Sequence, residues 1–204
     1  MPLRARKKER TRAAIARVAL DLFSARGFSA VTLAEIAEAA EVGQRTLFRY
    51  FADKEELLFD DDGAGQARLR AALDSRPEQE PPATAVLEAL LSLVSVWQDQ
   101  REQGRRRREV IDASPALRAR ERAKHAAYQE TLLAGLTARG LDRGQGRLLA
   151  GVAVACVEEA LSRWYADVSP GSPGLLDRLR QTFAELAELL GEIGPSALSR
   201  RSPR

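Results

Sequence analysis

The placement of glycine and proline constrains the fold of this 204-residue chain more than any other feature of its sequence. The segments between them are rich in Ala, Leu, Arg and Glu, which are strong helix formers. Apolar residues in these segments recur at helical spacing, and the strict alternation that marks β-strands is absent. From about Glu9 to Ala25, for example, one face carries Ile15, Val18, Ala19, Leu22 and Phe23. The pattern predicts an all-α protein with about nine helices.

Start and stop signals give the approximate bounds of the later helices. Capping boxes begin at Thr32 and Asp53, Ser114 precedes a proline, and Gly104 and Gly140 are placed to end helices. The proline-rich residues 76–82 are typical of a linker. These signals predict helices over residues 32–40, 44–50, 53–75, 83–103, 105–113, 115–138, 142–167 and 175–193.

Composition and short motifs exclude several classes of protein. With one cysteine (Cys156) and one histidine (His125), the chain can form neither a disulfide framework nor a Cys/His zinc site. The longest apolar run, Leu148 to Val157, is too short to span a bilayer, and no secretory signal is evident. Asp60 to Asp62 would point apart on a helix rather than converge on a metal ion. Because no catalytic motif stands out either, we expect a cytoplasmic protein that is not an enzyme and uses no metal or cofactor.

Residues 32–51 have the pattern of a helix, a short turn and a second helix. Leu47 and Phe51 anchor the second helix by its inner face, which leaves polar residues facing outward near its start. A helix-turn-helix presents such residues to base edges in the major groove, where Arg reads guanine and Gln reads adenine. We expect base contacts from Gln44, Arg45, Thr46 and Arg49, and phosphate contacts from Thr32, Tyr50 and Lys54.

The residues from Thr32 to Ala40, from Gln44 to Phe51 and from Asp53 to Leu57 resemble the DNA-binding domain of the TetR family of transcriptional regulators. The resemblance covers about residues 10 to 60 and extends to the caps and the spacing. It departs from the family's commonest pattern at three positions, which weakens any inference about the operator sequence. Glu41 stands where Gly is frequent and should carry left-handed strain, Gly43 stands where Ser is usual, and Phe48 stands where Tyr is frequent.

The resemblance implies a homodimeric, ligand-responsive regulator, and most often a repressor, that binds palindromic double-stranded DNA. It also implies a division into a DNA-binding region with a basic N-terminal arm, an effector-binding and dimerisation region, and a flexible tail. We place these regions at residues 1–55, 56–193 and 194–204.

The first twelve residues are strongly basic, with only Glu9 to oppose six positive side chains. A mobile basic arm beside a helix-turn-helix is placed to touch phosphates or to enter the minor groove, although it is also typical of a solvated tail. We assign Arg12, the last basic residue of this segment, to the DNA-binding set.

The middle of the chain is expected to enclose a small, largely hydrophobic effector. The predicted pocket residues come from the broad apolar helix and from the helices that follow it: Leu90, Val94, Trp97, Ile111, Leu117 and Tyr128. The stretch from Arg106 to Ala127 is similar to TetR regulators whose C-terminal domain binds acyl-CoA-like compounds. The run Arg105 to Arg108 would suit an anionic head group, but such runs are more often solvated helix faces.

By the same resemblance, the last two helices pair with those of a second chain as a four-helix bundle, and no membrane is involved. The residues expected at this interface are Leu148, Val152, Cys156, Leu179, Phe183, Leu186 and Leu190. Two alternatives from other classes stay open, namely a DNA-binding protein without sequence specificity and a helical small-molecule-binding protein or enzyme.

Overall fold

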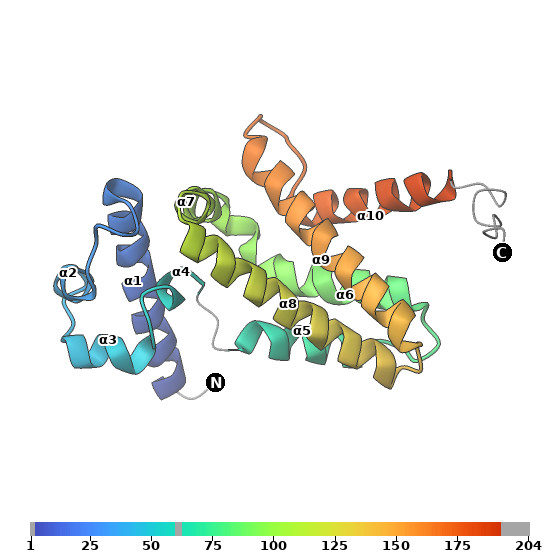
Figure 1. Ribbon diagram of the computed structural model, residues 1–204, viewed down its shortest axis with the longest axis horizontal. Helices are drawn as coiled ribbons and strands as arrows, with labels where there is room; N and C mark the ends of the chain where they lie inside the picture. Colours follow the sequence, from blue (N-terminus) through green and yellow to red (C-terminus); the bar gives the residue numbers. More distant parts are fainter. Residues whose placement is uncertain (1–2, 60–62, 193–204) are drawn as a thin grey trace, which may run out of the picture. The chain divides into compact units, whose positions relative to one another are not determined.

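The computed structural model describes residues 3–59 and 63–192, with the backbone alone for residues 3–6. All regular elements in these residues are helical, which confirms the predicted fold class (Figure 1). The α-helices are α1 (Leu3–Arg26), α2 (Leu33–Ala39), α3 (Gln44–Tyr50), α4 (Glu56–Phe59), α5 (Ala64–Asp74), α6 (Pro82–Val94), α7 (Arg101–Asp112), α8 (Pro115–Ala138), α9 (Arg143–Ala166) and α10 (Leu175–Gly191). One 3₁₀ helix, η1 (Ser95–Gln100), lies between α6 and α7.

The chain folds into two compact units. The first takes in the described residues up to Gly65 together with Glu102–Ala127, and the second takes in Gln66–Arg101 and the described residues from Tyr128. The first half of α8 therefore belongs to the unit that holds the predicted helix-turn-helix.

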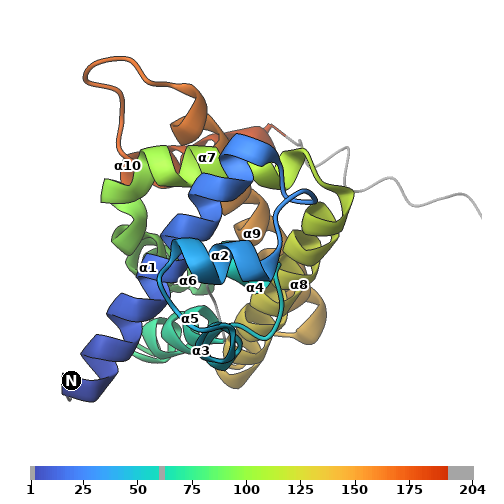
Figure 2. The ribbon, with the colours of Figure 1, turned by 90° about the vertical axis from the view of Figure 1, so that its left-hand side faces the viewer.

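The first unit is built on α1, which packs against α2 and α4, while α2 packs against α3 (Figure 2). Its core is closed by residues from α7 and α8, which follow much later in the chain. The buried side chains are Ile15, Ala16, Ala19, Leu20, Phe23, Val31, Ile36, Ala37, Leu47, Phe51, Leu57, Leu58, Val110, Ile111 and Leu117. This core fixes α3 from its inner face and so determines which of its residues face outward.

The second unit packs α10 against α9, α6 and η1, and α6 against α9 (Figure 1). Its core includes Leu90, Val94 and Trp164 in the interior, with Trp97 and Tyr128 partly buried at its edge. Among the residues that the structure describes, no helix is long and apolar enough to cross a membrane.

Most predicted helix bounds agree with the structure, but several expectations were wrong. The first helix begins at Leu3 instead of about Glu9, because Arg, Lys, Ala and Glu all sustain a helix there. Gly104 lies inside α7 and does not end a helix. The broad apolar helix ends at Val94, and the chain continues as the 3₁₀ helix η1 in place of further α-helix.

Residues 53–75 form two helices in place of the single one expected. Gly63, which precedes α5, has a φ of +91°, which no α-helical residue adopts. The residues Asp60 to Asp62, which we considered as a metal site, lie outside the described residues, as does the tail from Gly194. Within the described part of the chain, no group of three or more His, Cys, Asp or Glu residues is placed to hold a metal ion.

Candidate nucleic-acid interface

The turn between α2 and α3 is defined by local backbone geometry. The backbone N–H of Val42 donates to the carbonyl of Ala37 at 2.9 Å, and Glu41 between them has a φ of +53°. That value confirms the left-handed conformation expected at Glu41, which a residue with a Cβ adopts only with strain. Gly43 caps α3 without a side-chain hydrogen bond, and α3 then runs from Gln44 to Tyr50 as the sequence predicts.

The burial pattern of α3 separates an inner from an outer face. Leu47 and Phe51 are buried in the core of the first unit, whereas Gln44, Arg45 and Arg49 are exposed. Thr46 and Tyr50 are half-buried at the borders of the two faces. Three of the four residues predicted to read bases thus share the exposed face, and all four lie in the first two turns of one short helix. This is the arrangement that a reading helix requires.

Arg45 and Arg49 on this face differ in whether their side chains contact other residues of the protein. In the described part of the chain Arg45 makes no hydrogen bond or ion pair, while the Arg49 guanidinium lies 5.3 Å from the centroid of the Tyr50 ring. An exposed arginine without a partner loses nothing inside the protein when it turns toward a base or a phosphate.

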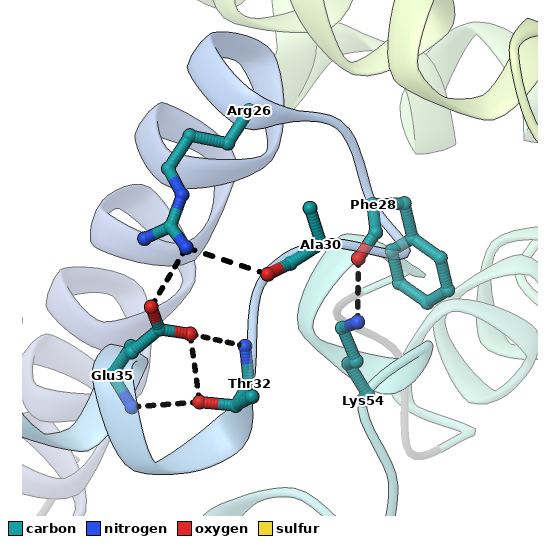
Figure 3. A network of polar contacts seen from close by, with 6 residues as sticks. All are labelled: Arg26, Phe28, Ala30, Thr32, Glu35 and Lys54. Atoms are coloured by element: carbon teal, nitrogen blue, oxygen red, sulfur yellow. Dashed lines mark hydrogen bonds and ion pairs between the residues drawn. The ribbon is translucent and has the colours of Figure 1, made fainter.

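Thr32 caps α2 and is held in a polar network at the end of α1 (Figure 3). Its backbone N–H and its hydroxyl both donate to Glu35 at 2.7 Å, and the N–H of Glu35 donates back to the hydroxyl. Arg26 donates to the same carboxylate at 2.7 Å and to the carbonyl of Ala30 at 3.4 Å. The capping box predicted from the sequence is present, and it joins α2 to the last turn of α1.

These contacts lower the pKa of Glu35 to about 2, chiefly through the backbone N–H of Thr32, then through its hydroxyl and Arg26. Hydrogen bonds to a carboxylate favour its charged form. Glu35 therefore stays ionised at all moderate pH values.

Lys54 holds the loop between α1 and α2 from the other side (Figure 3). Its ammonium donates to the carbonyl of Phe28 at 2.5 Å and lies 4.3 Å from the centroid of the Phe28 ring. Burial lowers the pKa of Lys54, although Glu55 opposes the shift. Thr32 and Lys54 both have partners within the first unit, and their expected phosphate contacts stay predictions.

Arg12 is the predicted DNA-binding residue whose surroundings differ most from the expectation. It is only 8% exposed, and its guanidinium lies over the Phe51 ring at 4.4 Å. It donates to the carbonyl of Tyr50, the last residue of α3, and forms an ion pair with Glu56 at 3.5 Å. Glu56 in turn accepts the backbone N–H of Ala52 at 2.5 Å. Arg12 thus joins α1 to the end of α3 and to α4.

The other basic residues near the start of the chain lie on α1 and do not form an arm without regular structure. Lys7, Lys8 and Arg10 are exposed, while the side chains of Arg4 and Arg6 lie outside the described residues. Their contact with phosphate stays a prediction.

The arginine run on α7 is engaged within the first unit. Three of its members form ion pairs with carboxylates: Arg105 with Glu102 and Glu109, Arg106 with Asp21, and Arg108 with Asp112 and Glu121. Arg106 joins α7 to α1, and the Arg108–Glu121 pair joins α7 to α8. These contacts support the solvated-face interpretation of the run over an anionic-ligand site.

The six predicted pocket residues belong to two different cores. Leu90, Val94, Trp97 and Tyr128 lie in or against the core of the second unit. Ile111 and Leu117 are instead buried in the core of the first unit, beneath the helix-turn-helix. This division could not be predicted from helical spacing, because a buried leucine has the same spacing in either core.

The seven predicted interface residues differ widely in exposure. Leu148 is 72% exposed and Leu190 is 55% exposed, whereas Leu179 and Cys156 are buried within their own chain. Val152, Phe183 and Leu186 are partly buried against the core of the second unit. Leu189 was not among the predicted interface residues, but it is 61% exposed and lies three residues after Leu186 on α10. That spacing was the available signal.

Two family profiles match the chain. The profile described as "Bacterial regulatory proteins, tetR family" matches residues 15–60, and the profile described as "MftR C-terminal domain" matches residues 80–191, more than half of the chain. The chain belongs to the TetR family. The matched N-terminal segment contains α2 and α3, the elements that carry the exposed polar face.

Two curated relatives of this TetR-family chain are transcriptional regulators. One is the HTH-type transcriptional regulator TcmR of Streptomyces glaucescens, which is 41% identical over half of this chain and 45% of its own length. The other is the putative mycofactocin biosynthesis transcriptional regulator MftR of Mycobacterium tuberculosis, 32% identical over 62% of this chain. The match covers 64% of the length of MftR. The chain therefore spans between about half and two thirds of the length of these two relatives.

Solved structures of two other proteins share the fold at low sequence identity. FadR of Bacillus subtilis, solved in complex with stearoyl-CoA, has a TM-score of 0.61 and 16% identity, over 85% of this chain and 96% of FadR. NalD of Pseudomonas aeruginosa, the secondary repressor of the MexAB-OprM multidrug efflux pump, has a TM-score of 0.56 and 20% identity. The match with NalD covers 88% of this chain and 96% of NalD.

Proposed function

We propose that this TetR-family protein is a homodimeric, ligand-responsive repressor that binds a palindromic operator through α3. The observation that carries the proposal is the outer face of α3, where Gln44, Arg45 and Arg49 are exposed. Leu47 and Phe51 fix the opposite face of this segment in the core. Two copies of this helix would enter successive major grooves about one helical turn apart. Because the proposed partner is genomic DNA, we expect the protein to act in the cytoplasm.

The reading residues have distinct proposed roles. The fork of an arginine guanidinium matches the two acceptors of guanine, and the amide of a glutamine matches adenine. We assign Gln44, Arg45 and Arg49 on the exposed face to base edges. We assign Thr46 and Tyr50, at the borders of this face, to a base and to a phosphate. We keep Thr32 and Lys54 as proposed phosphate contacts, and we propose that Arg12 holds α1 against the end of α3 and against α4.

The effector is proposed to bind in the second unit, next to Leu90, Val94, Trp97 and Tyr128. These side chains are apolar or aromatic, which favours a largely hydrophobic ligand. FadR of Bacillus subtilis was solved with stearoyl-CoA, which makes an acyl thioester one class of effector to test. A ligand releases the operator only if its affinity differs between the DNA-binding and the released conformations.

The dimer is proposed to form through the exposed apolar residues of α9 and α10. Leu148 and Leu190 are the predicted interface residues with the greatest exposure, and Leu189 adds to the same apolar surface of α10. Leu190→Arg should convert the dimer to a monomer in analytical ultracentrifugation. Because Leu190 is exposed in the single chain, the substitution should leave the far-UV circular dichroism spectrum unchanged. A dimer that persists in both Leu190→Arg and Leu148→Arg would contradict this interface.

Selection of bound sites from random DNA, followed by binding measurements with variants, tests the proposal. Arg45→Ala should weaken binding to the selected operator about tenfold to 100-fold and relax the preference at one base pair of each half-site. Arg17→Ala is the matched control, because Arg17 is exposed on α1 outside the helix-turn-helix. A selection that returns no preferred sequence would favour the architectural alternative. Turnover of a candidate ligand by the purified protein would favour the enzyme alternative.

A further inference from the structure

Phe48 is an apolar side chain in the middle of the polar face of α3. It is 54% exposed, and every other large apolar side chain exposed by more than half lies in the second unit, as far as the chain is described. The first unit thus covers its other large apolar residues and leaves this one in solvent. An aromatic side chain exposed to this degree contributes less to the stability of its own unit than a buried one.

The helical phase of α3 places Phe48 among the reading residues. Residues four apart lie on one side of a helix, so Gln44 and Phe48 form one exposed row and Arg45 and Arg49 form the next. Phe48 lies one turn, about 6 Å, after Gln44 along the helix axis. A helix that brings Gln44 and Arg45 to base edges therefore brings Phe48 to the groove as well.

The chemistry of a phenyl ring limits what Phe48 can recognise there. The ring has no hydrogen-bond donor or acceptor, so it cannot pair with the polar atoms of the bases. The one apolar group that a base pair displays in the major groove is the C5-methyl group of thymine. We propose that Phe48 is a specificity-determining residue that reads a thymine methyl group in each half-site of the operator. This inference rests on the proposed function, since it requires α3 to enter the major groove.

The replacement of thymine by deoxyuridine tests the proposal, because it removes the methyl group and leaves every hydrogen-bonding atom in place. Each thymine of the selected operator is replaced in turn, in both half-sites, and the dissociation constant is measured by fluorescence anisotropy at fixed salt. Burial of one methyl group predicts a loss of about fourfold per half-site, or about 15-fold for the palindrome. The loss should occur at one thymine position, and the other thymines serve as internal controls.

The same operators are then measured with Phe48→Ala and with Phe48→Leu. Phe48→Ala should bind the thymine and deoxyuridine operators equally, while Phe48→Leu should retain part of the difference because its side chain is apolar. Both variants should unfold at the temperature of the wild type, since Phe48 is not part of the core.

Three results would overturn the proposal. The first is an operator in which replacement of thymine by deoxyuridine weakens binding at no position. An operator whose half-sites contain no thymine would count as the same result. The second is an effect that survives in Phe48→Ala, which would assign the methyl contact to another residue. The third is a selection without any preferred sequence, which would refute the proposed function together with this inference. The first two leave sequence-specific binding intact, so failure of this inference is distinguishable from failure of the proposed function.

Discussion

Replacement of Arg12 by methionine should destabilise the first unit and disturb sequence-specific DNA binding without removing a phosphate contact. Methionine keeps an unbranched apolar side chain in the buried site but removes the guanidinium. The variant then loses the hydrogen bond to the Tyr50 carbonyl, the ring contact with Phe51 and the ion pair with Glu56.

The size of the effect follows from these three contacts. A buried hydrogen bond to a charged group contributes about 2 kcal/mol, and a partly desolvated cation–π contact contributes about 1 kcal/mol. Removal of one partner from a fully buried ion pair costs about 3–5 kcal/mol, but the Glu56 side chain is 15% exposed and keeps its bond to Ala52. We therefore expect about 1 kcal/mol from this pair and a total loss of about 3–4 kcal/mol in the free energy of unfolding.

Urea denaturation followed by far-UV circular dichroism measures the loss, and hydrogen exchange locates it. Peptides that cover the end of α3 and the start of α4 should exchange faster in Arg12→Met than in wild type. Arg17→Met on the same helix is the control, since Arg17 is exposed and should change the free energy by less than about 0.5 kcal/mol. In a double-mutant cycle, Arg12→Met and Glu56→Gln should couple by about 1 kcal/mol.

DNA binding separates a positioning role from a direct contact. At a temperature where Arg12→Met is fully folded, its affinity for the selected operator should fall more than its affinity for random duplex. The salt dependence on random duplex should stay that of wild type, whereas loss of a phosphate contact lowers the slope by about one per protomer. A lowered slope, or a stability loss under about 1 kcal/mol, would refute the role that we derive from the structure.

Three further predictions concern single groups. Glu41→Gly should raise the free energy of unfolding, measured by urea denaturation, by about 0.5–1 kcal/mol. Relief of the left-handed strain at φ +53° exceeds the cost of the added backbone entropy of glycine in the unfolded chain. An unchanged free energy would show that the turn is unstrained. Because the folded-state pKa of Glu35 is lowered to about 2, the stabilisation by its cap should be complete above about pH 4.5 and lost as the pH falls toward 2. The difference in melting temperature between wild type and Glu35→Gln should shrink over that interval, and a constant difference would contradict the assignment. Burial raises the pKa of the Cys156 thiol, so it should react with a thiol reagent at pH 8 far more slowly than a free cysteine; rapid labelling of the folded protein would show that the site opens.

The sequence predicts well what short-range chemistry decides. Thr32 and Asp142 accept hydrogen bonds from backbone N–H groups two or three residues ahead, so the start of each helix is encoded locally. The face of α3 follows from Leu47 and Phe51, because two apolar residues four apart fix the inner side of so short a helix. These features could be predicted because no distant residue is needed to make them.

Features that depend on distant residues could not be predicted in the same way. The bond from Arg12 to Tyr50 joins residues 38 positions apart, and the sequence alone shows only one more basic residue in a basic segment. Gly104 costs a helix about 1 kcal/mol relative to alanine. The burial of Ile111 against residues from the start of the chain, a long-range contact that the sequence does not show, helps to offset that cost in α7.

The arginines of the first unit divide by whether their charge is already paired. Arg105, Arg106 and Arg108 have carboxylate partners in the chain, and Arg12 is buried against Glu56. A cation that already has a carboxylate partner must give it up to bind a phosphate, so these residues add little to DNA affinity. The exposed Arg45 has no such partner in the described chain, which leaves its whole charge to the DNA. DNA affinity should therefore depend less on the formal net charge of +3 than on the number of unpaired cations on the face of α3.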